Sequence, residues 1–99
     1  METKEITILW SIAAKDSLES IYDYYFQFSE RAAERIRKDI LDKVYTLRFI
    51  KQYQIDEINP EYRRIIARHY KIVYKVESQT ILILNIFDTR QDPAKSKIQ

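Results

Sequence analysis

The amino-acid sequence predicts an α+β fold in which a helical hairpin packs on one face of a small, mostly antiparallel four-stranded sheet. Two observations carry this prediction. Apolar residues recur at helical spacing through the first half of the chain, whereas the second half holds three short β-branched and aromatic runs between turn-forming residues. A further run of this kind precedes the helical region, so the expected order is β-α-α-β-β-β.

The first strand is expected at Ile6 to Trp10, and Ser11 after it offers a hydroxyl for capping a helix. A first helix follows, with apolar residues three or four positions apart. We expect this partly aromatic stripe to pack in the core, and it consists of Leu18, Ile21, Tyr25 and Phe28, widened by Tyr22 and Phe26.

A second helix begins after Ser29, which can end the first helix and cap the next. About two residues join the helices, so they must run antiparallel. The core-facing stripe of the second helix is Ala33, Ile36, Ile40, Val44 and Leu47. A polar connection from Lys51 to Glu61 contains Asn59-Pro60, where proline prevents further helix.

Three strands are expected next, at 62–67, 70–76 and 81–87. The last is almost continuously apolar, which predicts an interior strand. Arg68-His69 forms the turn between the first two, and we expect His69 to take any positive φ. The polar tail, 91–99, is expected to be frayed.

This turn fixes which side chains share a face, because opposed residues of paired strands lie on the same side. One face, with Tyr70, Ile72, Tyr74 and Ile65, should pack on the helices. The opposite face, called the cationic face below, consists of Tyr62, Arg64, Ile66, Lys71, Val73 and Lys75.

Between Tyr62 and Val76 the sequence has five basic residues and no acidic one. Such a cluster indicates either a solvated sheet surface or a surface that binds a polyanion. For the second reading, arginine and lysine could hold phosphates and Tyr62 could stack on a base. The target-binding candidates are therefore Arg64, Lys71, Lys75 and Arg90.

Composition excludes several kinds of chemistry. The chain has 99 residues, no cysteine, no glycine and one histidine. Thiolate nucleophiles are excluded, glycine-rich nucleotide loops are absent, and a multi-histidine metal site cannot form. We therefore expect no cofactor and no metal, and one domain spanning 1–99.

The cellular setting can also be predicted. A cysteine-free chain suits a reducing cytoplasm. The sequence contains no run of about 18 apolar residues, the length needed to span a membrane, and Met1 to Ile6 lacks the apolar stretch of a signal peptide. A cytoplasmic protein without a membrane partner is expected.

Several segments, in this order, resemble the RelE/ParE superfamily of bacterial toxins. The helical segment resembles the ParE-type hairpin, 62–76 resembles the family's central β-hairpin, and the end resembles its last strand and arginine-rich "RRDP" motif. The residues concerned are Ala14 to Leu18, Ile21, Tyr24-Tyr25, Ser29, Ala32-Ala33, Tyr62 to Ile65, Tyr70 to Val76, Ile81 to Phe87 and Thr89 to Pro93.

This resemblance implies the toxin of a type II toxin–antitoxin module, also described as a plasmid stabilisation protein, which inhibits bacterial growth. It implies a cognate antitoxin as partner, which typically lays a helix and an extended segment over the toxin. A homodimer or a toxin–antitoxin heterotetramer is compatible with exposed strand edges.

Three functions remain open within the superfamily. A ParE-like toxin, which the long helical hairpin favours, would bind a target such as DNA gyrase without acting as an enzyme. A RelE-like toxin would cut mRNA on the ribosome without a metal, using Arg64, Lys71, Arg90 and Tyr62 as catalytic candidates. However, no tyrosine or histidine follows Arg90, where such ribonucleases usually have their acid. The third is a non-toxic relic that only binds its antitoxin.

Overall fold

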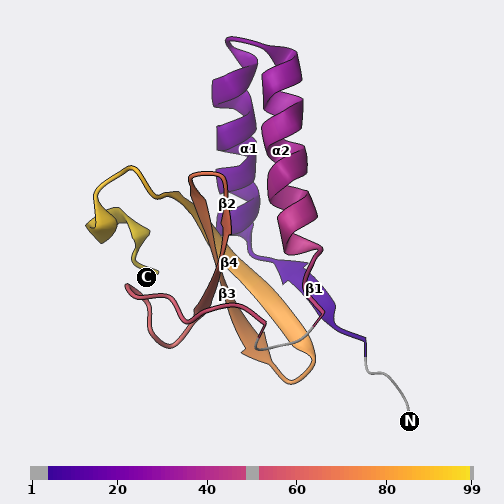
Figure 1. Cartoon of the computed structure of the whole chain (residues 1–99), viewed down its shortest axis with the longest axis vertical. Coiled ribbons are helices and arrows are strands. Elements are labelled where there is room, and N and C mark those ends of the chain that lie inside the picture. The colour runs from indigo at the N-terminus through magenta and orange to yellow at the C-terminus, as the bar shows by residue number, and fades with distance from the viewer. Residues whose placement is uncertain (1–4, 49–51, 99) are drawn as a thin grey trace.

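The structure, a computed structural model, describes residues 5–48 and 52–98. The elements follow one another as β1 (Thr7–Trp10), α1 (Ile12–Phe26), α2 (Glu30–Val44), β2 (Arg63–Ala67), β3 (Tyr70–Glu77), β4 (Thr80–Asp88) and the short 3-10 helix η1 (Pro93–Ser96) (Figure 1). This confirms the predicted order and the α+β class. Of the expected segments, Met1 to Lys4, Lys51 and Gln99 lie outside the described residues.

The four strands form one open sheet in the order β1-β4-β3-β2. The first strand pairs parallel to β4, whereas β4, β3 and β2 pair antiparallel. The expected interior position of the last strand is therefore confirmed. The register of β2 on β3 is also the predicted one, with Ala67 opposite Tyr70 and Ile65 opposite Ile72.

Both helices pack against one face of the sheet, where α1 packs on β4 and α2 packs on β2, since their buried side chains share one cluster with those of the sheet. The predicted stripe of α2 is buried throughout, and it meets the buried Ile65, Ile72 and Tyr74 of the sheet. Apart from Ala33, these residues belong to one hydrophobic cluster, so burial of the predicted faces holds the two layers together.

Serine caps begin both helices as predicted. The Ser11 Oγ accepts a hydrogen bond from the Ala14 amide at 3.0 Å and donates one to the Leu84 carbonyl at 2.7 Å. This serine therefore starts α1 and also attaches its first turn to β4. The Ser29 Oγ accepts from the Ala32 amide at 3.1 Å and begins α2.

The turn between β2 and β3 takes its positive φ at a different residue from the one predicted. Arg68, and not His69, has φ 56°, and Ser78 has φ 57° in the next turn. Each is the first of two loop residues, the position that needs positive φ in a type II′ turn. The Arg68 Nε donates to the Asp39 carboxylate of α2 at 2.6 Å, which attaches this turn to the helical hairpin.

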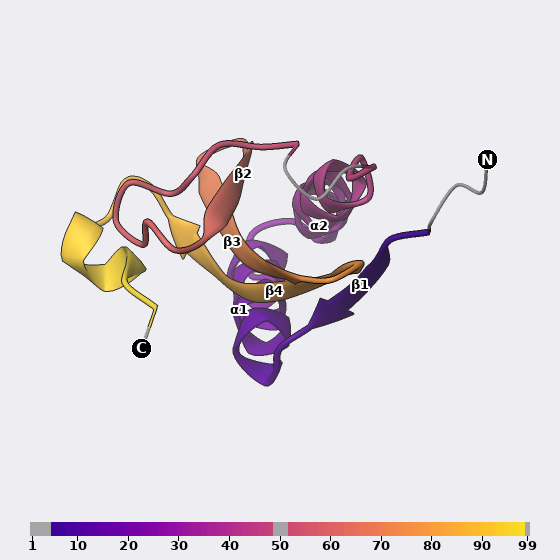
Figure 2. The same ribbon diagram turned by 90° about the horizontal axis from the view of Figure 1, so that it is seen from below.

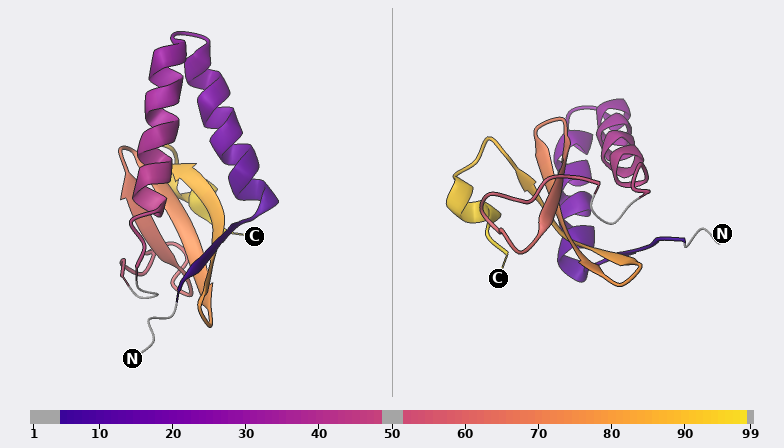
Figure 3. Two further views of the ribbon diagram at one scale, coloured as in Figure 1. Left: turned by 90° about the vertical axis from the view of Figure 1, so that its right-hand side faces the viewer. Right: turned by 60° about the horizontal axis from the view of Figure 1, so that its bottom comes forward.

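The aromatic stripe of α1 is only partly in the core. Leu18, Ile21 and Tyr25 pack against the core as predicted. The prediction is wrong for Phe26 and Phe28, which are 49% and 72% exposed. The reason is length, because the helical hairpin projects well beyond the end of the sheet (Figures 1 and 3) and nothing described lies beneath its last turns.

Two irregular segments meet at the edge of the sheet formed by β2. Residues 52–62 loop around β2 and reach the C-terminal tail (Figure 2). The tail, expected to be frayed, instead forms η1, and Ser96 is buried. Its hydrogen bonds to Asn59 explain this order and are described below.

None of the described helices is both long and apolar enough to cross a lipid bilayer.

Candidate functional site

The cationic face is partly covered in the folded chain, at Lys71 and Val73, whereas Ile66 is 43% exposed. Lys71 is 6% exposed, and Val73 beside it is fully buried. The segment 52–62 lies over this face and brings a carboxylate, Asp56, that is 1% exposed. The face has no acidic residue of its own, but the fold supplies one from another part of the chain.

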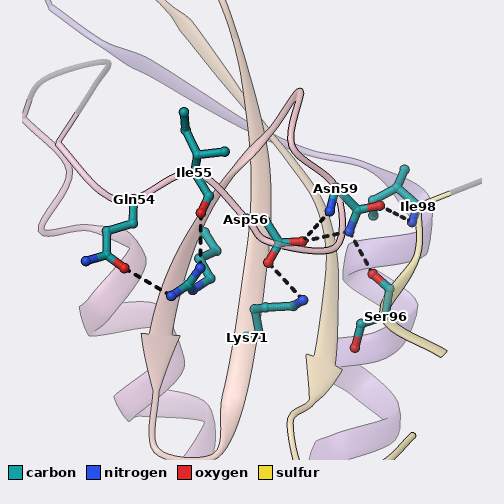
Figure 4. A network of polar contacts seen from close by, with 8 residues as sticks. Gln54, Ile55, Asp56, Asn59, Lys71, Ser96 and Ile98 are labelled. Atoms are coloured by element: carbon teal, nitrogen blue, oxygen red, sulfur yellow. Dashed lines mark hydrogen bonds and ion pairs between the residues drawn. The ribbon is translucent and has the colours of Figure 1, made fainter. Parts of the chain in front are cut away.

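Lys71 forms a buried ion pair with this carboxylate (Figure 4). The Lys71 Nζ lies 2.9 Å from the Asp56 Oδ1. The other carboxylate oxygen accepts from the Asn59 backbone amide at 2.9 Å and from its Nδ2 at 2.8 Å. Burial alone would raise the pKa of Asp56, but the hydrogen bonds from Lys71 and Asn59 outweigh burial and lower it.

Asn59 extends this network to the C-terminal tail (Figure 4). Its Nδ2 also donates to the Ser96 carbonyl at 2.8 Å, and its Oδ1 accepts from the Ile98 amide at 2.8 Å. One asparagine side chain thus connects the buried ion pair to the end of the chain. Because every polar group in this network has a partner, the arrangement is suited to a structural role.

The arginines of β2 also bind the segment 52–62. The Arg64 guanidinium donates to the Ile55 carbonyl and to the Gln54 side chain, each at 3.0 Å. Arg63, on the helix-facing side, reaches the Tyr53 carbonyl beyond the strand. These bonds help to hold the segment against the sheet.

The remaining cations of 62–76 are paired as well. Arg68 binds Asp39 of α2, and the Lys75 Nζ lies 2.9 Å from the Glu77 carboxylate. Tyr62 is half-buried, and its backbone amide donates to the Asn59 carbonyl at 2.9 Å. All five basic residues that the sequence placed in this cluster therefore have partners within the chain.

Arg90 lies apart from these residues. It is exposed just after β4, and its Nη2 is 3.2 Å from the Asp88 carboxylate. Within 5–48 and 52–98, no hydrogen bond or ion pair connects it to Arg64, Lys71 or Lys75. The sequence-predicted candidates thus divide into a group under the segment 52–62 and an isolated arginine.

Arg90 has neighbours that the sequence did not predict. The Tyr70 hydroxyl donates to the Tyr25 hydroxyl at 3.3 Å, and this hydroxyl lies 3.5 Å from the His69 Nε2. Desolvation, followed by the charge of Arg90, lowers the pKa of His69. Asp88, and to a smaller extent Tyr25, raises the pKa of Arg90. These groups come from α1, from the start of β3 and from the end of β4, and only the fold brings them together. No local sequence motif could therefore have indicated them.

This cluster lies along a groove of about 620 Å³ between α1 and the C-terminal tail. Ser17, Ser20 and Tyr24 of α1 line one side, and Arg90 and Lys95 line the other. The groove offers hydroxyl and cationic donors beside aromatic rings, a combination that can hold a peptide segment.

Metal ligands do not gather in the part of the chain that the structure describes, where no three His, Asp or Glu side chains lie close enough to hold an ion.

Comparison with known proteins identifies a toxin family and solved structures with the same fold. Residues 8–93 match the family model of the ParE toxin of type II toxin–antitoxin system, parDE. Among solved structures, the chromosomal ParDE toxin–antitoxin system from P. aeruginosa includes a chain with the same fold, at a TM-score of 0.73 and 22% identity, covering 84% of this chain and 95% of that one. No curated protein matches the chain.

Proposed function

Because the chain belongs to the ParE toxin family of type II toxin–antitoxin systems, we propose that a cognate antitoxin neutralises it and that it acts by binding a protein target such as DNA gyrase. The toxin assignment itself follows from the family. The target and the neutralisation are the proposal.

The ion pairs and hydrogen bonds that Lys71 and Arg64 form within the chain favour a protein target over RNA. A metal-free ribonuclease needs arginine or lysine free to stabilise charge on phosphate. Here Lys71 is buried against Asp56, and Arg64 is bound to the segment 52–62. Replacing these contacts with RNA would break a buried ion pair, which costs about 3–5 kcal/mol when one partner is lost. Binding to a protein target requires no such opening.

The groove beside α1 supports the antitoxin part of the proposal. It is open to solvent, and its lining includes the carboxylates Asp16 and Asp88 as well as the cations Arg90 and Lys95, so it offers hydrogen-bond donors and acceptors of both charges to a peptide. The outer edge of β1 is also unpaired in the described sheet, so a strand from an antitoxin or a second toxin could add there. A heterotetramer or a homodimer is compatible with these surfaces.

A RelE-like, ribosome-dependent endoribonuclease is the second candidate, and one observation favours it. His69 and Tyr25 lie near Arg90, so two side chains that can transfer a proton adjoin a cation. They take this place although no tyrosine or histidine follows Arg90 in the sequence. In that case Arg90 would act with Arg64, Lys71 and Tyr62 only after the segment 52–62 had moved.

Induction of the protein without its antitoxin separates these functions. We expect growth arrest, gyrase-linked DNA breaks and intact mRNA, with recovery when the antitoxin is co-expressed from the neighbouring gene. Early cuts in translated mRNA without DNA breaks would refute gyrase binding and support the ribonuclease. Normal growth at a confirmed protein level would indicate the antitoxin-binding relic.

A further inference from the structure

The end of the helical hairpin exposes three aromatic side chains, which we call the aromatic tip: Tyr24, Phe26 and Phe28. They are 56%, 49% and 72% exposed. The rings of Tyr24 and Phe28 are in edge contact at 5.5 Å between centroids. The Phe26 ring contacts that of Tyr22, at 5.9 Å between centroids. Exposed aromatic side chains at one end of a molecule mark an interaction site, because the fold of the isolated chain leaves their apolar surface in water.

The helices beneath the tip are braced against each other. The Tyr22 hydroxyl donates to the Glu34 carboxylate at 2.8 Å, and the Arg37 guanidinium lies 4.4 Å from the centre of the Tyr22 ring. Arg37 also pairs with Glu34 at 2.7 Å. The tip is therefore presented by a braced hairpin, which lowers the entropy lost on binding.

Charge argues against nucleic acid as the occupant. Residues 19–38, which form this end of the hairpin, include four acidic and four basic side chains. Binding to a phosphate backbone depends on a positive surface that releases counterions. A neutral surface with exposed aromatic rings suits a protein instead.

Area and shape argue against a second copy of the chain. Three aromatic side chains of about 150–250 Å² each, exposed to this degree, would bury about 700 Å² in a tip-to-tip dimer. Stable interfaces bury about 1,200–2,000 Å². The tip also projects from the molecule (Figures 1 and 3), so it fits a concave site on a larger protein.

We infer that the aromatic tip inserts into an apolar cleft of the toxin's protein target, and that it is separate from the groove that receives the antitoxin. This inference rests on the proposed function. The two surfaces can be tested separately through Phe26 and Phe28, because neither of them lines the groove, whereas Tyr24 does.

The test is the double variant Phe26→Gln/Phe28→Gln, which keeps Tyr24 in the groove. Its matched control is Ile12→Gln/Tyr45→Gln, since Ile12 and Tyr45 are 78% and 53% exposed and lie at the other end of the helical hairpin. Growth arrest on induction, antitoxin co-purification, the sedimentation mass and the melting temperature would be measured for both variants and the wild type.

We expect the tip variant to lose at least tenfold in toxicity while melting within about 4 °C of the wild type, a shift of less than about 1 kcal/mol for a domain of this size. Its antitoxin binding should stay within twofold, and the control should match the wild type in every measurement.

Several results would overturn the inference. Unchanged toxicity of the tip variant, or an equal loss in the control, would remove the tip from target binding. Lost antitoxin binding with retained toxicity would assign the tip to the antitoxin, and a wild-type dimer that the tip variant dissolves would assign it to a second copy. A non-toxic wild type would refute the proposed function itself, whereas a toxic wild type without gyrase-linked breaks would refute gyrase alone and leave the tip comparison valid.

Discussion

The cationic face and the aromatic tip differ in how far their side chains find partners within the chain. On the cationic face, Lys71 is buried and paired with Asp56, and Arg64 is bound to the preceding segment. At the tip, Phe28 is 72% exposed, and its ring is in edge contact with that of Tyr24. Groups that are already satisfied stabilise the fold, whereas unsatisfied ones remain available to a partner. The charged cluster, the more conspicuous feature of the sequence, is therefore the weaker candidate for binding.

The largest effect on stability is expected from removing the Asp56 carboxylate, which pairs with Lys71 beneath the segment 52–62. Asp56→Ala would leave the Lys71 ammonium buried without a partner, and we expect unfolding to become easier by about 3–5 kcal/mol. Urea denaturation measures this loss. The control, Asp42→Ala, removes an exposed pair with Lys38 and should cost less than about 1 kcal/mol. A loss below 1 kcal/mol for Asp56→Ala would show that the cationic face is not fixed by this pair.

The same carboxylate should make stability sensitive to acid. The pKa of Asp56 is lowered in the fold, so its contribution is fully present above the pKa of the unfolded state and is lost as the pH falls through the folded value. We expect the difference in unfolding free energy between the wild type and Asp56→Asn to shrink as the pH falls below about 4. A difference that stays constant from pH 7 to pH 2 would contradict a charged Asp56.

A smaller effect is expected from detaching the tail. Asn59→Ala removes the hydrogen bonds to the Ser96 carbonyl and the Ile98 amide together with the Nδ2 bond to Asp56, and we expect a loss of about 1–3 kcal/mol. Hydrogen exchange at the Ile98 amide should accelerate more than exchange in β3. Equal acceleration in both places would mean that Asn59 supports the whole fold and not the tail specifically.

The smallest effect is expected at the exposed end of the β2–β3 hairpin. Arg68→Ala breaks the pair with Asp39, in which both side chains are about 40% exposed, so stability should fall by less than about 1 kcal/mol. Thermal unfolding measures this change. A loss as large as that of Asp56→Ala would remove the distinction between buried and exposed cations of the cluster.

The sequence predicted much of the fold because local spacing encodes it. The stripe of α2, the caps Ser11 and Ser29 and the register from Ala67 and Tyr70 depend on residues close together in the chain. By contrast, Asp56 reaches Lys71 only through the path of an irregular segment. The exposure of Phe28 depends on where the sheet ends, a property that helical periodicity does not contain.

The candidate site was less predictable for the same reason. Alternation along β2 and β3 identified the face that bears Arg64 and Lys71, but it could not show that other segments cover this face. The neighbours of Arg90 come from α1 and from the turn at His69. Contacts between segments far apart in the sequence decide whether a cation is free, and one sequence alone does not record them.

Whether the cationic face contributes to toxicity is decided by Arg64→Gln/Arg90→Gln, which removes both arginines of the ribonuclease alternative while leaving the Lys71–Asp56 pair in place. Growth arrest would be measured at matched protein level, with melting temperature as the control for folding. If the chain acts by binding a protein through surfaces other than its cationic face, this variant should stay within about threefold of wild-type toxicity, a change of less than about 1 kcal/mol. A well-folded variant that has lost its toxicity, together with the loss of mRNA cuts seen for the wild type, would show that these arginines act on RNA and that the chain is a ribonuclease.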